Sequence, residues 1–86
     1  MGKSNFRMND TQAFLTAEKF DELKKELDHL KTVRRKEVAE SLEYARSLGD
    51  LSENAEYQEA RDMQSAIEER IGYLEKVIKR VLIMYH

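Results

Sequence analysis

The sequence predicts an all-α fold, a long antiparallel two-helix coiled-coil hairpin with an acidic tip. Three observations support this prediction. The 86 residues contain no proline and are 37% charged, which suits long helices better than a compact mixed fold. Apolar residues recur at steps of three and four in two segments, which Gly49 separates. The apolar positions of the two segments also match in reverse order, as antiparallel pairing requires.

The first helix is expected to begin at Thr16, whose hydroxyl can accept a backbone N–H of the first turn. Leu15 and Phe20 flank this cap as a hydrophobic staple. The apolar seam falters at Arg34, and the helix is expected to end at Gly49, which suits a left-handed position after a helix. The seam residues are Phe20, Leu23, Leu27, Leu30, Val38, Leu42 and Ala45.

The second helix is expected to begin within residues 50–54. Its apolar members are Ala60, Met63, Ile67, Ile71, Leu74, Ile78 and Val81. Folding the chain between Asp50 and Leu51 pairs the two seams, because five apolar pairs have residue numbers that add to 101. These pairs are Phe20 with Val81, Leu23 with Ile78, Leu27 with Leu74, Leu30 with Ile71, and Val38 with Met63. Arms of roughly 30 residues would be about 45 Å long, enough to carry the tip into a deep site.

One residue and one short run depart from this regular pairing of apolar positions. Arg34 falls opposite Ile67 in this pairing, where Glu68 and Glu69 are available as partners. Residues 81–85 are five consecutive apolar residues, and these cannot all face one seam. They either pack against apolar residues of the N-terminal segment at the base or begin a strand of a second domain. The second alternative is the preferred prediction.

Negative charge is concentrated at the predicted tip. Residues 49–62 carry one basic and five acidic side chains, whereas the net charge of the whole chain is −2. Asp50 and Glu53 are three residues apart, so their carboxylates would project from neighbouring faces of a first helical turn. The interpretation favoured by the residues alone is a capping box, with Asp50 as N-cap. The alternative is that the pair supplies oxygen ligands to a divalent cation whose other ligands come from elsewhere.

Two arginines and two tyrosines lie just behind the tip. Arg46 and Arg61 are on opposite arms at a similar height. They are either solvated ions that balance nearby acidic residues or a cradle for phosphate, and the residue types leave both alternatives open. Tyr44 and Tyr57 also add to 101, and they are expected to brace the neck of the hairpin rather than stack on a base.

The composition argues against several classes of protein. The absence of cysteine excludes disulfides and thiolate metal sites. A pI near 5.7 argues against a general nucleic-acid coat, which needs a basic excess. No apolar run approaches the roughly 18 residues that span a bilayer. The chain also has no glycine-rich phosphate loop and no nucleophile beside an obvious base, so it is a poor candidate for an autonomous enzyme.

The tip resembles the signature of the Gre family of bacterial transcript cleavage factors. The most specific stretch is residues 45–57, Ala-Arg-Ser-Leu-Gly-Asp-Leu-Ser-Glu-Asn-Ala-Glu-Tyr. The likeness extends to the helix opening at residues 15–20, to Val33-Arg34-Arg35 with Glu37-Val38, and to Ala60-Arg61 and Glu69-Arg70-Ile71. The resemblance implies a Gre-type N-terminal coiled-coil domain over residues 14–84, with its tip at 49–57, after a flexible tail of residues 1–13.

The resemblance implies a transcription elongation factor that inserts its tip into the secondary channel of RNA polymerase in the cytoplasm. The factor would stimulate the polymerase's endonucleolytic cleavage of backtracked RNA. Asp50 and Glu53 would act at the polymerase active site by helping to hold a second Mg²⁺, which the isolated chain would not bind. Arg46 and Arg61 would contact the RNA 3′ segment. The residues implied to support the tip are Gly49, Leu51, Asn54, Tyr44 and Tyr57. Neither a membrane nor sequence-specific DNA recognition is expected.

Three departures from the family pattern carry their own expectations. Lys36 stands where the family usually has proline, so the helix should be less kinked and the seam around Arg34 more continuous. Ser52 stands where the tip often has lysine, which removes a positive charge near the RNA. The resemblance also implies a C-terminal globular domain that docks on the polymerase; we expect this chain to lack that domain and therefore to bind the polymerase weakly. Two alternatives remain: a Gre-like blocker of the channel, and a structural coiled coil without a catalytic partner.

Overall fold

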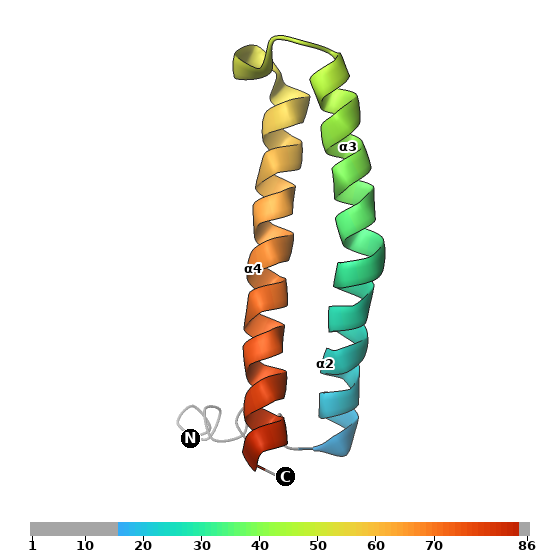
Figure 1. Cartoon of the computed structure of the whole chain (residues 1–86), viewed down its shortest axis with the longest axis vertical. Coiled ribbons are helices and arrows are strands. Elements are labelled where there is room, and N and C mark those ends of the chain that lie inside the picture. Colours follow the sequence, from blue (N-terminus) through green and yellow to red (C-terminus); the bar gives the residue numbers. More distant parts are fainter. Residues whose placement is uncertain (1–15, 85–86) are drawn as a thin grey trace, which may run out of the picture.

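The structure is a computed structural model that describes residues 16–84, and Figure 1 shows two long helical arms lying antiparallel and joined at one end. In chain order the elements are α2 (Ala17–His29), a π-helical turn (Leu30–Arg34), α3 (Arg35–Ser47), a 3₁₀ turn (Leu51–Glu53) and α4 (Ala55–Met84). The 30 residues of α4 rise about 45 Å. No strand occurs within the described residues. The predicted all-α hairpin is confirmed.

The first arm begins at the predicted cap. The Thr16 hydroxyl accepts the backbone N–H of Lys19 at 3.0 Å, and the Thr16 carbonyl accepts the N–H of Phe20 at 2.9 Å. These bonds satisfy donors that the first turn of a helix otherwise leaves unpaired. Leu15, the other half of the predicted staple, and the predicted tail of residues 1–13 lie outside the described residues.

The seam residues form two buried clusters between the arms. The base cluster, near the chain ends, consists of Leu23, Leu74 and Ile78. The tip cluster consists of Val38, Leu42, Ala45, Tyr57, Ala60, Ile67 and Ile71. Leu23 and Ile78 were predicted to pair and lie in the same cluster. Leu27 packs against the cluster that contains its predicted partner Leu74. The predicted register therefore holds in the lower half of the hairpin.

A π-helical turn divides the first arm. The backbone N–H of Arg35 donates to the carbonyl of Leu30, five residues back instead of four. From Leu30 to Val38 the apolar seam advances eight residues, one more than a heptad, and the wide turn absorbs the additional residue. The arm therefore continues as helix through Lys36, but the seam around Arg34 is interrupted. The expectation of a more continuous seam is wrong.

The additional residue also shifts the pairing above the turn. Val38 is 3% exposed, whereas its predicted partner Met63 is 42% exposed, so this pair is wrong. Arg34 forms an ion pair with Glu37 on its own arm, and its Nη2 lies 3.4 Å from the Met63 sulfur. Arg34 therefore does not reach the glutamates predicted for it on the opposite arm.

Two doubly hydrogen-bonded ion pairs join the arms along their flanks. Arg70 donates to both carboxylate oxygens of Glu26, at 2.8 and 2.9 Å. Arg35, the neighbour of the residue predicted for this contact, donates twice to Glu68, both times at 2.8 Å. Hydrogen bonds from arginine favour the charged carboxylate, and they hold the pKa of Glu26 and that of Glu68 below the ordinary value.

The C-terminal apolar run is helical. Residues 81–85 were predicted to begin a strand, but α4 continues to Met84, so the prediction is wrong for residues 81–84. Tyr85 lies outside the described residues. A helix satisfies its backbone hydrogen bonds within itself, whereas a strand would need a neighbour. Leu82, Ile83 and Met84 are exposed, since the run is longer than one seam can bury. Within residues 16–84 no helix has the length and apolar character needed to cross a membrane.

Candidate functional site

The turn at the tip begins at the predicted glycine. Gly49 has a φ of 86°, and its N–H donates to the carbonyl of Arg46 at 3.0 Å. The N–H of Leu48 donates to the carbonyl of Ala45 at 3.1 Å. Glycine adopts this left-handed conformation without the local backbone strain that an L-residue would suffer. The chain can therefore reverse direction directly after α3.

Asp50 follows in the same left-handed region, with φ 48° and ψ 63°. It is the one non-glycine residue with positive φ in the described part of the chain. Its carboxylate makes no capping hydrogen bond, so the predicted capping box of Asp50 and Glu53 is wrong. The reason is conformational, because an N-cap residue normally has an extended backbone from which its side chain reaches the next turn.

Asn54 caps α4 instead and ties the two arms together. Its Oδ1 accepts the backbone N–H of Tyr57 at 3.0 Å, the usual bond from an N-cap to the third helical residue. Its Nδ2 donates to the carbonyl of Ala45 at 2.7 Å and to that of Gly49 at 3.2 Å. One half-buried side chain thus joins the end of α3, the turn and the start of α4.

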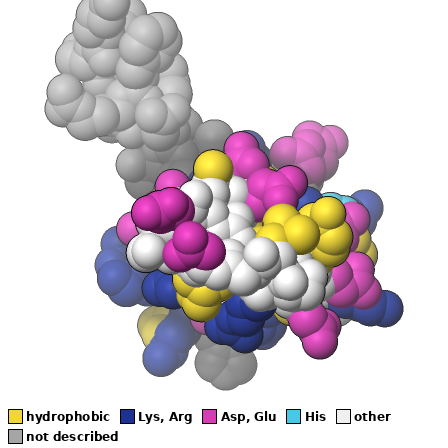
Figure 2. All heavy atoms as spheres, turned by 90° about the horizontal axis from the view of Figure 1, so that it is seen from above, with side chains coloured by type: hydrophobic (Ala, Val, Ile, Leu, Met, Phe, Trp, Pro, Cys, Tyr) yellow, Lys and Arg dark blue, Asp and Glu magenta, His cyan; other side chains and the backbone are white. Residues whose placement is uncertain are grey.

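Asp50 and Glu53 lie on this clamped turn with their carboxylates unengaged. The N–H of Glu53 donates to the carbonyl of Asp50 at 3.1 Å, which fixes the spacing of their backbones. Both side chains are exposed, and neither carboxylate makes a hydrogen bond or an ion pair with any of residues 16–84. Figure 2 looks down onto the tip end, where acidic side chains surround much of the rim.

The acidic pair could supply only part of a cation site. Among the described residues there is no group of three or more His, Cys, Asp or Glu side chains that could hold a metal ion. Carboxylate oxygens are the hard donors that Mg²⁺ prefers, and this ion commonly uses one or two protein carboxylates with other ligands from substrate and water. The donor chemistry of Asp50 and Glu53 therefore fits a shared Mg²⁺ site that a partner must complete.

Arg46 and Arg61 meet at the hydroxyl of Tyr57. The Nη1 of Arg61 donates to this hydroxyl at 3.0 Å, and its guanidinium lies 5.8 Å from the ring centroid. The hydrogen bond from Arg61, with a further contribution from Arg46, lowers the pKa of Tyr57 below its ordinary value. Tyr57 is buried, whereas both arginines are exposed. The structure thus brings the two predicted arginines together beside one phenol.

Tyr44 does not join this group. It is 61% exposed, so the prediction that it braces the neck together with Tyr57 is wrong. Ala45, the next residue, is 1% exposed and occupies the seam position instead. A displacement by one residue is what the π-helical turn produces in the part of the arm that follows it. Leu51, also predicted to support the tip, is exposed.

The comparisons with known proteins agree with this architecture. The family model of the GreA/GreB N-terminal domain, described as "Transcription elongation factor, N-terminal", matches residues 13–83. The chain belongs to the GreA/GreB N-terminal domain family. The resemblance of the tip to the Gre family is therefore confirmed, and the hairpin in Figure 1 is a GreA/GreB-type coiled coil.

Several curated relatives of this GreA/GreB-type chain carry the name transcription elongation factor GreA. The protein from Clostridioides difficile (strain 630) is 50% identical over 78 residues, which cover 90% of this chain and 49% of the relative. The protein from Macrococcus caseolyticus is 50% identical over 70 residues, or 81% and 44% of the two chains. The protein from Geobacillus kaustophilus is 47% identical over 76 residues, or 88% and 48%. The chain thus spans about half the length of the curated relatives it matches. No solved structure matches it.

Sequence reasoning missed the central position of Asn54 in this GreA/GreB-type tip, naming it only as support. A signal was available, because asparagine is a preferred N-cap residue and Asn54 stands directly before the helical pattern of α4. Asp50 was preferred because Asp-x-x-Glu fits a capping box. The left-handed backbone that prevents this has no clear signal in the sequence.

Proposed function

We propose that this chain is the part of a bacterial transcription elongation factor that enters the secondary channel of RNA polymerase and stimulates cleavage of backtracked RNA. Support comes from the family match and from the GreA relatives, which are named transcription elongation factors. The hairpin also has a suitable form, since α4 alone extends about 45 Å behind the tip. In this proposal the polymerase performs the hydrolysis and the chain activates it.

The observation that carries the proposal is the unengaged pair Asp50 and Glu53 on a turn that Asn54 clamps. These two residues would hold a Mg²⁺ ion jointly with groups of the polymerase and its substrate. When bound, the ion supplies electrostatic stabilisation to the oxygens that gain charge during phosphodiester hydrolysis. A rigid turn matters because a ligand pair that must first be ordered binds more weakly. The incomplete donor set also explains why the isolated chain is proposed not to retain the ion.

Arg46 and Arg61 are proposed to bind phosphates of the RNA 3′ segment. Tyr57 accepts a hydrogen bond from Arg61 and so holds this guanidinium near the tip. Arginine donates to phosphate through two parallel N–H groups, which suits a role in guiding a flexible strand. Ser52 adds no charge to this surface, so phosphate binding depends on the two arginines.

The test is RNA cleavage in backtracked bacterial polymerase complexes. The chain is compared with Asp50→Asn and Glu53→Gln, which preserve side-chain size and remove the charge. Faster cleavage than with polymerase alone is expected for the unchanged chain, with a loss of at least about tenfold in each variant, the scale of damage to a catalytic metal site. Glu69→Gln is the matched control, an exposed glutamate of α4 outside the tip. Circular dichroism checks that all variants remain helical.

Other outcomes contradict the proposal in different ways. Cleavage that survives both tip substitutions would remove the metal-sharing role. Slower nucleotide addition without cleavage would identify a channel blocker. A chain without effect on either reaction at high protein concentration would be a structural coiled coil or one that does not dock on the polymerase.

A further inference from the structure

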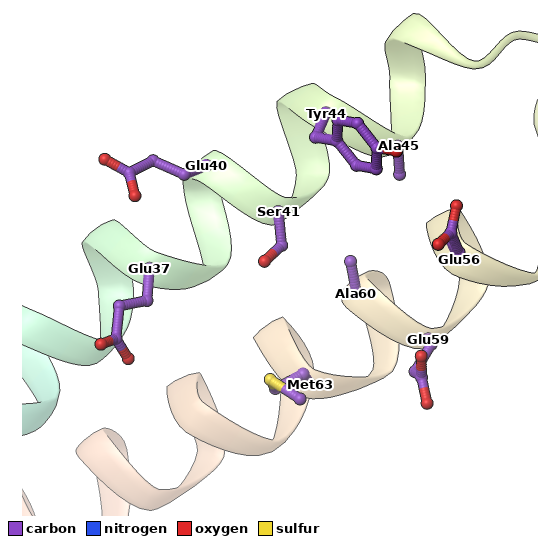
Figure 3. Close-up of a pocket in the computed structure, with 9 residues that line it drawn as sticks. All are labelled: Glu37, Glu40, Ser41, Tyr44, Ala45, Glu56, Glu59, Ala60 and Met63. Carbon is purple, nitrogen blue, oxygen red and sulfur yellow. The ribbon is translucent and has the colours of Figure 1, made fainter.

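A groove lies on one side of the hairpin just below the tip, where the proposed function assigns no residue. It has a volume of about 540 Å³ and is lined by residues of both α3 and α4, as Figure 3 shows. We name it the acidic groove, after the residues that characterise it: Glu37, Glu40, Glu56 and Glu59, with Tyr44 and Met63.

The groove exists because the seam is narrow at this height. Ala45 and Ala60 line it from the buried seam, and their methyl groups leave space that larger core residues would fill. Tyr44 and Met63 stand outside the seam and are exposed, so they give the groove apolar walls. Tyr44 and Met63 are exposed because the pairing of the arms is shifted by one residue above the π-helical turn.

The charge of the groove restricts what it can bind. Four glutamates line it and no basic residue does. Glu37 is paired with Arg34, but Glu40, Glu56 and Glu59 have no ion pair within the part of the chain that the structure describes. Such a surface repels the phosphates of a nucleic acid. It attracts a cationic protein segment, and electrostatic complementarity of this kind steers and orients a partner.

The apolar walls favour arginine or lysine over a simple cation. The exposed ring of Tyr44 can receive a guanidinium or an ammonium on its face, and aromatic rings bind such groups through cation–π contacts. Met63, whose sulfur also contacts Arg34, adds a flexible apolar wall that adapts to an irregular aliphatic stem. The combination of carboxylates and apolar walls in one groove matches a side chain that is apolar along its length and charged at its end.

We propose that the acidic groove docks an arginine- or lysine-bearing segment of a protein partner. The identity of that partner as RNA polymerase rests on the proposed function. Neither Arg46 nor Arg61 lines the groove, so the hairpin presents its cationic pair and its acidic groove at separate places. A basic segment seated in the groove would fix the rotation of the hairpin about its long axis. The arginines would then face a defined direction.

The direct test is a titration of the ¹⁵N-labelled chain with a short helical peptide that carries several arginines. A peptide of the same length with glutamates in their place is the control ligand. Saturable amide shifts are expected at Ser41 and Ala60 with the arginine peptide only, at physiological salt. The double variant Glu40→Gln with Glu59→Gln should bind about fivefold to tenfold more weakly, the effect of losing two exposed ion pairs.

The matched control is Asp28→Asn with Glu69→Gln, which removes the same charge from exposed residues away from the groove. This control should retain the affinity of the unchanged chain. Equal weakening in both double variants would overturn the proposal, because it would show diffuse attraction to negative charge. Shifts at the groove caused by an RNA oligonucleotide instead of the peptide would also overturn it.

The cleavage assay separates this inference from the proposed function. The groove variant keeps Asp50, Glu53 and both arginines, so it should reach full acceleration but need about fivefold to tenfold more protein for half of it. If only the groove inference fails, this concentration is unchanged while cleavage still depends on Asp50. If only the proposed function fails, no cleavage is stimulated and the arginine peptide still binds in the groove.

Discussion

The side-chain amide of Asn54 donates a hydrogen bond of 2.7 Å to the carbonyl oxygen of Ala45, so the residue that starts α4 also closes α3. Ala45 is buried in the tip cluster, and its carbonyl also accepts the N–H of Leu48. The bond from Asn54 therefore connects the packing of both arms with the turn that bears Asp50 and Glu53. The geometry of the tip depends on contacts from both arms.

Asn54→Ala is expected to destabilise the chain by about 1–3 kcal/mol, because it removes the cap of α4 and both bonds to the opposite side of the turn. Asn54→Ser keeps an N-cap acceptor but cannot make the crossing bonds, so its loss should be intermediate. Urea unfolding followed by circular dichroism measures both. If the serine variant were as stable as the unchanged chain, the bonds to Ala45 and Gly49 would contribute nothing.

The two glycines of the described chain should respond to alanine with opposite signs. Gly49→Ala is expected to cost about 1–2 kcal/mol, because φ is 86° and an L-residue is strained there even though a Cβ would meet no atom within 4 Å. Gly72→Ala lies inside α4 and is equally free of contacts, so it should stabilise by about 0.5–1 kcal/mol. Thermal unfolding of the two variants provides the comparison. A gain in stability at Gly49 would contradict the left-handed turn.

The ion pair of Glu26 and Arg70 should give stability a dependence on acid. The hydrogen bond from Arg70 lowers the pKa of Glu26 below its ordinary value of 4.5. The ordinary value is the pKa of Glu26 in the unfolded chain. The ion pair therefore contributes its full stabilisation above that pH, and this stabilisation is lost as pH falls through the lower pKa of the folded chain. Because both side chains are substantially exposed, its size is less than about 1 kcal/mol.

The measurement for this pair is the free energy of unfolding against pH for the chain and for Glu26→Gln. The variant should be less stable at neutral pH and equal to the unchanged chain once the carboxyl is protonated. Concentrated salt should reduce the neutral difference, since exposed pairs are screened. A difference that persisted in strong acid would point to packing rather than charge.

Deleting Thr32 is expected to leave the fold intact. The deletion restores a step of seven residues from Leu30 to Val38, so the π-helical turn can become α-helical without moving either half of the seam. The cost should be less than about 1 kcal/mol, the scale of the Thr32 hydrogen bond to the Asp28 carbonyl. Deleting Ala66 from α4, where the heptad is regular, should cost more than about 3 kcal/mol because it rotates buried residues out of the core.

Unfolding curves of the two deletion variants measure their losses in free energy of unfolding. Similar losses in both would mean that the additional residue in the first arm is not absorbed by the wide turn. A helical content that rises when Thr32 is removed would support the assignment further.

The overall hairpin could be predicted because local and long-range signals agree. Thr16 and Gly49 are suited by chemistry to the helix ends they occupy, and the apolar spacing identified both arms. The register was right below the π-helical turn, at Leu23 and Ile78, and wrong above it, at Met63 and Tyr44. Both errors have one cause, the additional residue that the π-helical turn absorbs between Leu30 and Val38. The step of eight residues from Leu30 to Val38 was the available signal.

The candidate site was predictable only in its chemistry. Asp50, Glu53, Arg46 and Arg61 were identified from their charges and from their place near the turn. The loss of the capping box at Asp50 was not predictable, because a left-handed backbone at aspartate is uncommon and depends on the fit of the whole turn. The acidic groove was not predicted, because the wrong register placed Tyr44 in the seam. In the structure Ala45 occupies the seam and Tyr44 is an exposed wall of the groove.

The π-helical turn holds no buried residue, and the half-buried Leu27 and Leu30 pack against both core clusters. We therefore expect the hairpin to behave as two cooperative units in series. Amide hydrogens above the turn should exchange with solvent as one group and those below it as another. The tip could thus loosen and reform while the lower half of the rod stays folded.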